Sequence, residues 1–139
     1  MAALIEKKAL TLSAAKSIAA AAEAKAVQLN VAAVISIMDD GANLLYLQRM
    51  DGAPIGSVVV SQDKSRSSVL FKSPTKDYET WLAGGLTSML KLDALPFEGG
   101  IPFVVGDQIV GAIGVSGGSA PQDGQIALAG ANWLLSQES

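Results

Sequence analysis

The glycine-rich segment VGAIGVSGGSAPQD, at residues 110–123, has the residue types of a binding loop. An apolar run is followed by Gly114, Ser116, Gly117 and Gly118, and then by a predicted helix. A strand that enters a helix in this way leaves unpaired backbone amides at the helix start, and these amides favour an anion. Glycines also let a ligand approach the backbone. The alternative is structural: the glycines only make a tight turn. The spacing is neither that of a P-loop nor that of a dinucleotide fingerprint.

Charged candidates lie outside this loop. Arg49 follows a predicted strand and can bind a carboxylate through two hydrogen bonds, or it forms an ordinary ion pair. Lys64 on a predicted helix is a candidate anion contact or base, or part of a solvated face. Glu98, next to Gly99 and Gly100, is the best candidate for a general base, because the glycines leave its carboxylate accessible. Its alternative is a solvated carboxylate.

Two residue types are absent from the 139 residues: the sequence has no histidine and no cysteine. These absences exclude thiol nucleophiles, Ser-His-Asp triads and histidine-based zinc sites, and no spacing indicates a metal site. A net charge of −3 argues against a nucleic-acid surface. No apolar run approaches the ~20 residues of a membrane span. We expect a single domain over residues 1–139, soluble and cytoplasmic, with no nucleic-acid or membrane partner.

The order of predicted elements is helix, hairpin, helices, hairpin, helix. Residues 55–72 are ambiguous, because their valines favour a strand while the spacing of Ile55, Val59 and Val69 partly fits a helix. Two hairpins predict an antiparallel sheet of at least four strands, with helices covering its faces. The predicted ranges are a helix at 12–29, strands at 31–39 and 44–50, short helices at 75–92, strands at 98–105 and 109–116, and a final helix at 121–136.

Several motifs together resemble the GlcG/HbpS family of small proteins, which is also similar to the C-terminal domain of PduO-type cobalamin adenosyltransferases. The resemblance spans roughly residues 9–135. The residues that carry it are DDGANL at 39–44, RMDGA at 49–53, Ser57, Lys64, Phe71, PT at 74–75, EGGIP at 98–102, VGAIGVSGG at 110–118 and QD at 122–123.

The resemblance implies an α+β fold, a profilin-like α-β-α sandwich with a five-stranded antiparallel sheet and helices on both faces. It also implies homo-oligomers, and some members bind haem. The PduO-type domain ligates haem iron through a histidine, which this sequence lacks, whereas the HbpS branch implies an oxygen ligand. The cofactor therefore stays open, and haem would have to bind without a histidine or cysteine ligand. Other candidate iron ligands are Met38, Met50, Met89, Tyr46 and Tyr78.

The leading functional hypothesis is a small-ligand binding protein, accessory to a metabolic pathway, whose ligand is haem or another anionic metabolite. Its predicted pocket combines the glycine-rich loop, Arg49 and residues 98–102. The alternative is a small cofactor-free isomerase or lyase acting beside a carbonyl group. In that hypothesis Glu98 or Lys64 is the base, and loop amides stabilise the developing oxyanion. A scaffold that only assembles with itself is the third hypothesis.

Overall fold

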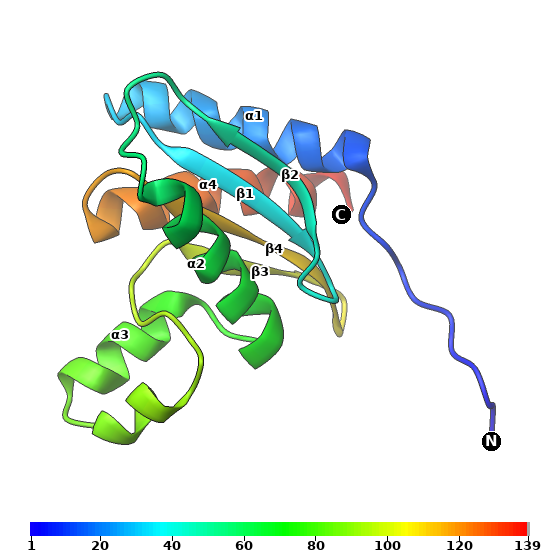
Figure 1. Cartoon of the computed structure of the whole chain (residues 1–139). Helices are drawn as coiled ribbons and strands as arrows, with labels where there is room; N and C mark the ends of the chain where they lie inside the picture. Colours follow the sequence, from blue (N-terminus) through cyan, green and yellow to red (C-terminus); the bar gives the residue numbers. More distant parts are fainter. Residues whose placement is uncertain (139) are drawn as a thin grey trace.

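The elements of the chain follow the predicted order (Figure 1). The computed structural model describes residues 1–138, so Ser139, the end of the predicted domain, lies outside the described residues. In chain order the elements are α1 (Leu12–Gln28), β1 (Val34–Asp39), β2 (Leu44–Arg49), α2 (Ser57–Phe71), α3 (Thr75–Ala83), the 3-10 helix η1 (Thr87–Lys91), β3 (Gly100–Val105), β4 (Gln108–Ser116) and α4 (Ala120–Gln137).

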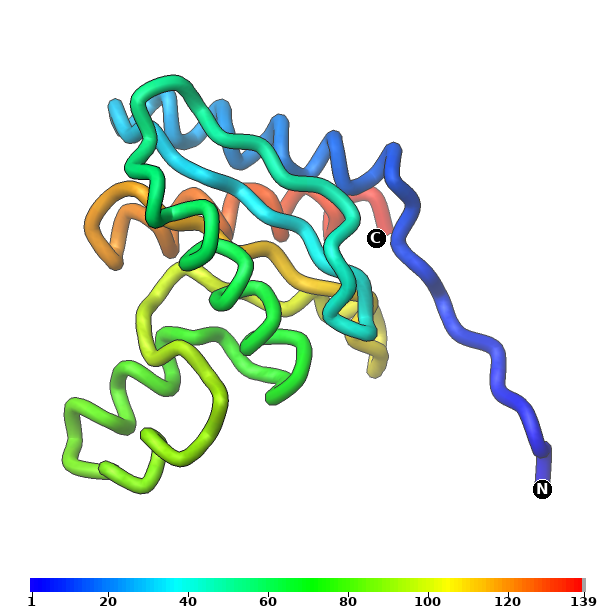
Figure 2. The backbone as a smooth tube through the Cα atoms, viewed as in Figure 1, coloured from blue at the N-terminus to red at the C-terminus, as the bar shows by residue number. Residues whose placement is uncertain are grey.

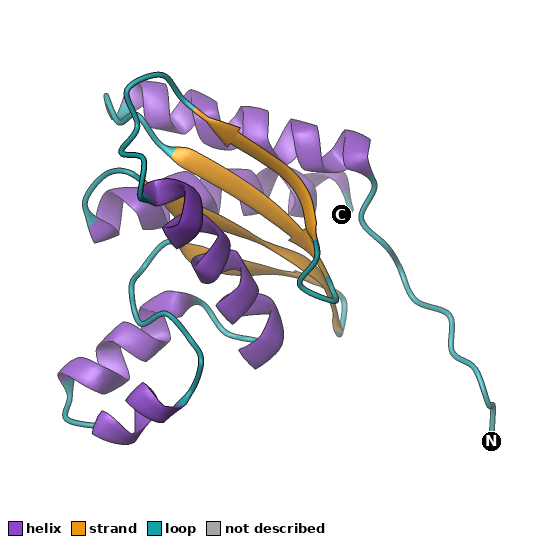
Figure 3. Ribbon diagram, in the orientation of Figure 1, coloured by secondary structure: helices purple, strands orange, loops and turns teal. Residues whose placement is uncertain are grey.

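The strands pair in the order β2-β1-β4-β3 and are antiparallel throughout (Figure 3). The predicted five-stranded sheet is wrong, because the sheet has four strands within residues 1–138. Residues 57–71, in the segment whose valines favour a strand, form the helix α2 instead. The α+β class and the helices on both faces are confirmed.

The apolar core lies between one face of the sheet and the helices α1 and α4. Ile35 and Ile37 of β1 and Val115 of β4 point to this face and are fully buried. The α1 side of the core consists mainly of alanines, whose small side chains let the helix pack closely. Gly130 of α4 has the same role, because an added β-carbon there would lie 3.1 Å from the Ile18 carbonyl oxygen.

Serines from α2 and the sheet form the contact on the other face. The hydroxyl of Ser36 in β1 donates to the Ser61 carbonyl oxygen at 2.9 Å and lies 2.9 Å from the Ser65 hydroxyl. The hydroxyl of Ser116 in β4 donates to that of Ser57 at 3.0 Å. The small residues at 57, 61 and 65 recur every four positions and so share one face of α2. This stripe of serines, rather than an apolar stripe, is the buried face of the helix.

The backbone of α2 lies directly on the sheet at Gly114 of β4. A β-carbon added at Gly114 would lie 2.6 Å from the backbone nitrogen of Ser65 and would also meet the Ser61 carbonyl oxygen. Both are backbone atoms, so neither can rotate away as the end of a side chain can. Glycine at position 114 is therefore required for the close contact of helix and sheet.

Residues 1–10 precede α1 as an extended arm that leaves the body of the protein (Figure 2). Its base is held by an ion pair between Lys7 and Asp40 at 2.8 Å and by two hydrogen bonds between the Lys8 backbone and the Gln108 side chain. Within residues 1–138 no helix is both long and apolar enough to cross a membrane.

The Gly114→Ala variant should be destabilised, because the added methyl group overpacks the contact between α2 and β4. We expect a loss of at least about 2 kcal/mol in the free energy of unfolding, within the usual cost of overpacking. Gly56→Ala is the matched control, since a β-carbon at Gly56 would meet nothing within 4 Å. Urea denaturation of both variants measures the difference. Equal stabilities would contradict the role given to Gly114.

Candidate functional site

The glycine-rich loop joins β4 to α4, and its amides are bonded within the chain. Ser119 and Gln122 cap the start of α4 through two reciprocal hydrogen bonds. The backbone amide of Gln122 donates to the Ser119 hydroxyl at 3.3 Å, and the backbone amide of Ser119 donates to the side-chain oxygen of Gln122 at 3.0 Å. The Gly118 amide donates to the Asp123 carboxylate at 2.8 Å. The loop therefore binds a carboxylate, as its sequence predicts, but the carboxylate is that of Asp123.

Asp123 is paired with Lys64 in a buried contact. The Lys64 ammonium donates to Asp123 Oδ2 at 3.1 Å and to the Val115 carbonyl oxygen at 2.8 Å. Each charged side chain is only 4% exposed. Burial raises the pKa of the Asp123 carboxyl, and the nearby Lys64 ammonium and Gly118 amide offset part of that rise. Lys64 therefore joins α2 to β4 and α4, and the alternative of a solvated helix face is wrong for this residue.

The variant Asp123→Asn should be strongly destabilised, because it keeps an acceptor for Gly118 but leaves the Lys64 charge buried without a counter-charge. Breaking a buried ion pair on one side typically costs about 3–5 kcal/mol. The double variant Asp123→Asn with Lys64→Met should recover much of that loss, because it no longer buries an unpaired charge. Chemical denaturation of the single and double variants measures this coupling. Strictly additive losses would contradict it.

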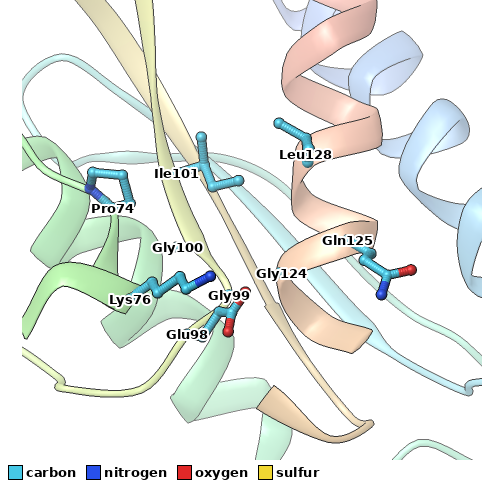
Figure 4. A pocket seen from close by; sticks show the side chains of 9 residues that line it. All are labelled: Pro74, Lys76, Glu98, Gly99, Gly100, Ile101, Gly124, Gln125 and Leu128. Atoms are coloured by element: carbon cyan, nitrogen blue, oxygen red, sulfur yellow. The ribbon is translucent and has the colours of Figure 1, made fainter. Parts of the chain in front are cut away.

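A cavity of about 240 Å³ lies where β3 begins, between the start of α3 and the first turns of α4 (Figure 4). We call it the Glu98 cavity. Its walls are largely apolar, and its charged side chains are those of Glu98 and Lys76. The lining residues are Pro74, Lys76, Glu98, Gly99, Gly100, Ile101, Gly124, Gln125 and Leu128.

Two contacts position the walls of the Glu98 cavity. The Gly100 amide donates to the Thr75 hydroxyl at 2.8 Å, which joins the start of β3 to the first turn of α3. The Glu98 side chain lies over the bare α-carbon of Gly124, where an added β-carbon would lie 2.7 Å from Glu98 Cδ. The carboxylate thus lies beside the amino-terminal part of α4, where the helix dipole favours negative charge.

A second cavity, of about 270 Å³, lies beside the buried ion pair. Its polar groups are already bonded to one another, as the contacts of Lys64, Asp123, Ser116 and Gly118 show. It therefore offers a ligand fewer free polar partners than the Glu98 cavity does. Its lining residues are Val60, Lys64, Phe97, Ser116, Gly118, Ala120 and Asp123.

The predicted site residues are divided among several places. Glu98, Gly99 and Gly100 line the Glu98 cavity, and Lys64, Ser116 and Gly118 line the second cavity. Gly114 lies beneath α2. Gly117 packs against the backbone of Ala32 and Ala33, where an added β-carbon would lie 2.8 Å from the Ala33 α-carbon.

Arg49 lies apart from both cavities. It is exposed at the end of the edge strand β2, opposite Val34 of β1, which in turn lies opposite Ser116 of β4. Two strand spacings separate Arg49 from Ser116, about 10 Å of backbone distance. The structure therefore does not bring Arg49 into one pocket with the loop and residues 98–102.

Sequence reasoning missed Lys76, Gln125 and Leu128 as lining residues of the Glu98 cavity. Lys76 carries no motif of its own, and it enters the cavity because its neighbour Thr75 is bonded to Gly100. Gln125 and Leu128 are three positions apart on α4 and so lie on one face of the helix. The only sequence signal for Lys76 was its place beside the Pro74-Thr75 motif.

Comparison with known proteins supports this assignment of the fold. A family model described as haem degrading protein HbpS-like matches residues 10–132. The chain belongs to this family. Protein GlcG of Escherichia coli strain K12 is 40% identical over 103 residues, which cover 73% of this chain and 77% of GlcG. The resemblance stated from the motifs is therefore confirmed.

Solved structures of HbpS-like relatives superpose on the chain over nearly its whole length. The crystal structure of Klebsiella pneumoniae protein ORFY matches with a TM-score of 0.88 and 35% identity, and covers 95% of this chain and 94% of that chain. A structure described as a PduOC:heme complex matches with a TM-score of 0.81 and 29% identity, over 90% of this chain and 94% of that one.

Proposed function

We propose that this protein binds a small charged metabolite in the Glu98 cavity, as an accessory protein of a metabolic pathway. The observation that carries the proposal is that the Glu98 side chain has no partner in the described part of the chain. This side chain faces a largely apolar cavity and has no hydrogen-bond or ion-pair partner within residues 1–138. The half-buried carboxylate therefore remains available to accept hydrogen bonds from a ligand. Membership of a family with a haem-bound relative supports ligand binding.

Haem is the ligand of the PduOC relative, and we tested whether the residues of the Glu98 cavity fit it. Haem iron is held in proteins by His, Cys, Met or Tyr side chains. None of these types lines the Glu98 cavity or the second cavity in the described part of the chain. Met38, Met89 and Tyr78 are buried, and the Met50 sulfur accepts a hydrogen bond from the Ala33 amide. The cavity therefore lacks the usual ligand types of haem iron, and the proposal is a smaller ligand.

The alternative function, a cofactor-free isomerase or lyase, uses the same cavity. The ion pair with Asp123 occupies Lys64, so Glu98 is the base that the alternative retains. Lys76, in the same cavity, would then stabilise the developing oxyanion. Binding and catalysis share their first step, and the binding test below applies to both.

Filling the cavity should abolish binding without unfolding the protein. Leu128 on α4 is 49% exposed, so Leu128→Trp places an indole in the cavity at little cost in stability. We expect a ligand found by mass-spectrometric screening of a metabolite library to bind the native chain and to lose at least tenfold in affinity for this variant. The control is Leu135→Trp, at a residue that is 40% exposed on the same helix and lines neither cavity. Binding that survives Leu128→Trp would contradict the proposed location.

Titration with ferric haem should give a broad, shallow change in the Soret band, since the cavity offers no strong iron ligand. The measurement is absorbance spectroscopy on the purified protein. Glu98→Gln is the matched variant, because it removes the one carboxylate that lines the cavity. A sharp low-spin spectrum at one haem per chain would show that another residue ligates the iron and that haem is the ligand.

A further inference from the structure

The two charged side chains of the Glu98 cavity have opposite signs and are not paired with each other. Lys76 lies at the start of α3 and Glu98 just before β3, and both face the same space (Figure 4). No ion pair joins them within the described chain, and the Lys76 ammonium has no other partner there. The cavity thus presents one free cation and one free anion.

The positions of these two charges are set by the fold. The hydrogen bond from Gly100 to Thr75 joins the backbone segments that carry Glu98 and Lys76. Gly124 gives the Glu98 side chain its place against α4, because any larger residue would displace the carboxylate. Lys76 and Glu98 therefore reach the same cavity from two different elements, and a ligand bound there can contact both.

The chemistry of the two groups restricts the ligand. A lysine ammonium only donates hydrogen bonds, and a carboxylate only accepts them. A simple carboxylic acid would satisfy Lys76 but would bring like charge to Glu98, and a simple amine would do the reverse. A molecule with a carboxylate and an ammonium group satisfies both, and its net charge of zero matches the zero sum of the pair.

The apolar walls add a third requirement. Pro74, Ile101 and Leu128 contribute apolar surface to the same cavity, beside the two charged groups. We infer that the ligand is a small zwitterion of the amino acid class with a short apolar side chain, its carboxylate bound by Lys76 and its ammonium group by Glu98. This inference rests on the proposed function, since it names the ligand class of the same cavity.

Calorimetric titration with four molecules of nearly the same skeleton tests the inference. They are L-valine, its hydroxy analogue 2-hydroxy-3-methylbutanoate, 3-methylbutanoate and isobutylamine. We expect valine to bind at least tenfold more tightly than the acid without a donor and than the amine. Tighter or equal binding of the hydroxy acid would overturn the zwitterion and indicate a hydroxy acid instead. Equal affinity for all four would overturn the role of both charges.

Charge-removing variants assign each end of the ligand. Lys76→Gln should weaken the binding of valine about 10- to 100-fold, because one charge-assisted hydrogen bond is lost, and should not weaken the binding of isobutylamine. Glu98→Gln should weaken the binding of valine by a similar factor and should not weaken the binding of 3-methylbutanoate. Lys91→Gln and Glu6→Gln, at exposed residues outside the cavity, are the matched controls and should change nothing.

The outcome also separates this inference from the proposed function. If none of the four molecules binds at millimolar concentration, the zwitterion inference is overturned. The proposed function still stands in that case if another library ligand binds the native chain and is lost in Leu128→Trp. If ligands are found but none is affected by Leu128→Trp, the proposed location fails and the inference fails with it.

Discussion

The close contact between α2 and the sheet is the constraint on which the rest of this structure depends. At Gly114 the helix backbone reaches the strand backbone with no side chain between them, and serines make the hydrogen bonds beside this contact. A larger residue at the contact would separate helix and sheet, and the residues farther along α2 would move with it. Lys64, one position before Ser65, reaches Asp123 because the helix is held this close.

The buried pair of Lys64 and Asp123 explains why the glycine-rich loop is not an open anion site. The loop has backbone amides of the kind that attract an anion, and the Gly118 amide is bonded to the chain's own Asp123 carboxylate. Asp123 in turn neutralises the Lys64 ammonium buried beside it. Because these groups satisfy one another, they stabilise the junction of α2, β4 and α4.

We propose the neighbouring Glu98 cavity as the binding site, because the charged ends of Glu98 and Lys76 have no partner within residues 1–138. Family membership alone would suggest haem, because a related structure contains it. The side chains that line the cavity favour a different ligand. They provide a carboxylate, an ammonium group, an amide and apolar surface, which suit a small polar molecule better than an iron porphyrin. Relatives with one fold can therefore differ in ligand through a few lining residues.

The sequence by itself determined the order of the elements, the two hairpins, the glycine-rich junction before the last helix and the family, because these depend on local periodicity and on contiguous motifs. The absence of histidine and cysteine likewise limited the chemistry from the start. Local pattern left residues 57–71 ambiguous, because valines favour a strand whereas the serines of every fourth position form the buried face of a helix. The buried face of α2 is identified by its contact with Gly114, which is distant in the chain.

Only the tertiary structure decided which charged residues share a cavity. Lys64 and Asp123 are 59 positions apart, and Thr75 and Gly100 are 25 apart, so neither contact has a signal in local spacing. Arg49 and Lys76 show the consequence most clearly. Arg49, at a strand end in a motif that resembles the family, lies on an exposed edge, while Lys76, without a motif, lines the cavity. Burial and partners depend on which segments meet in space, and a pattern along the chain does not contain that information.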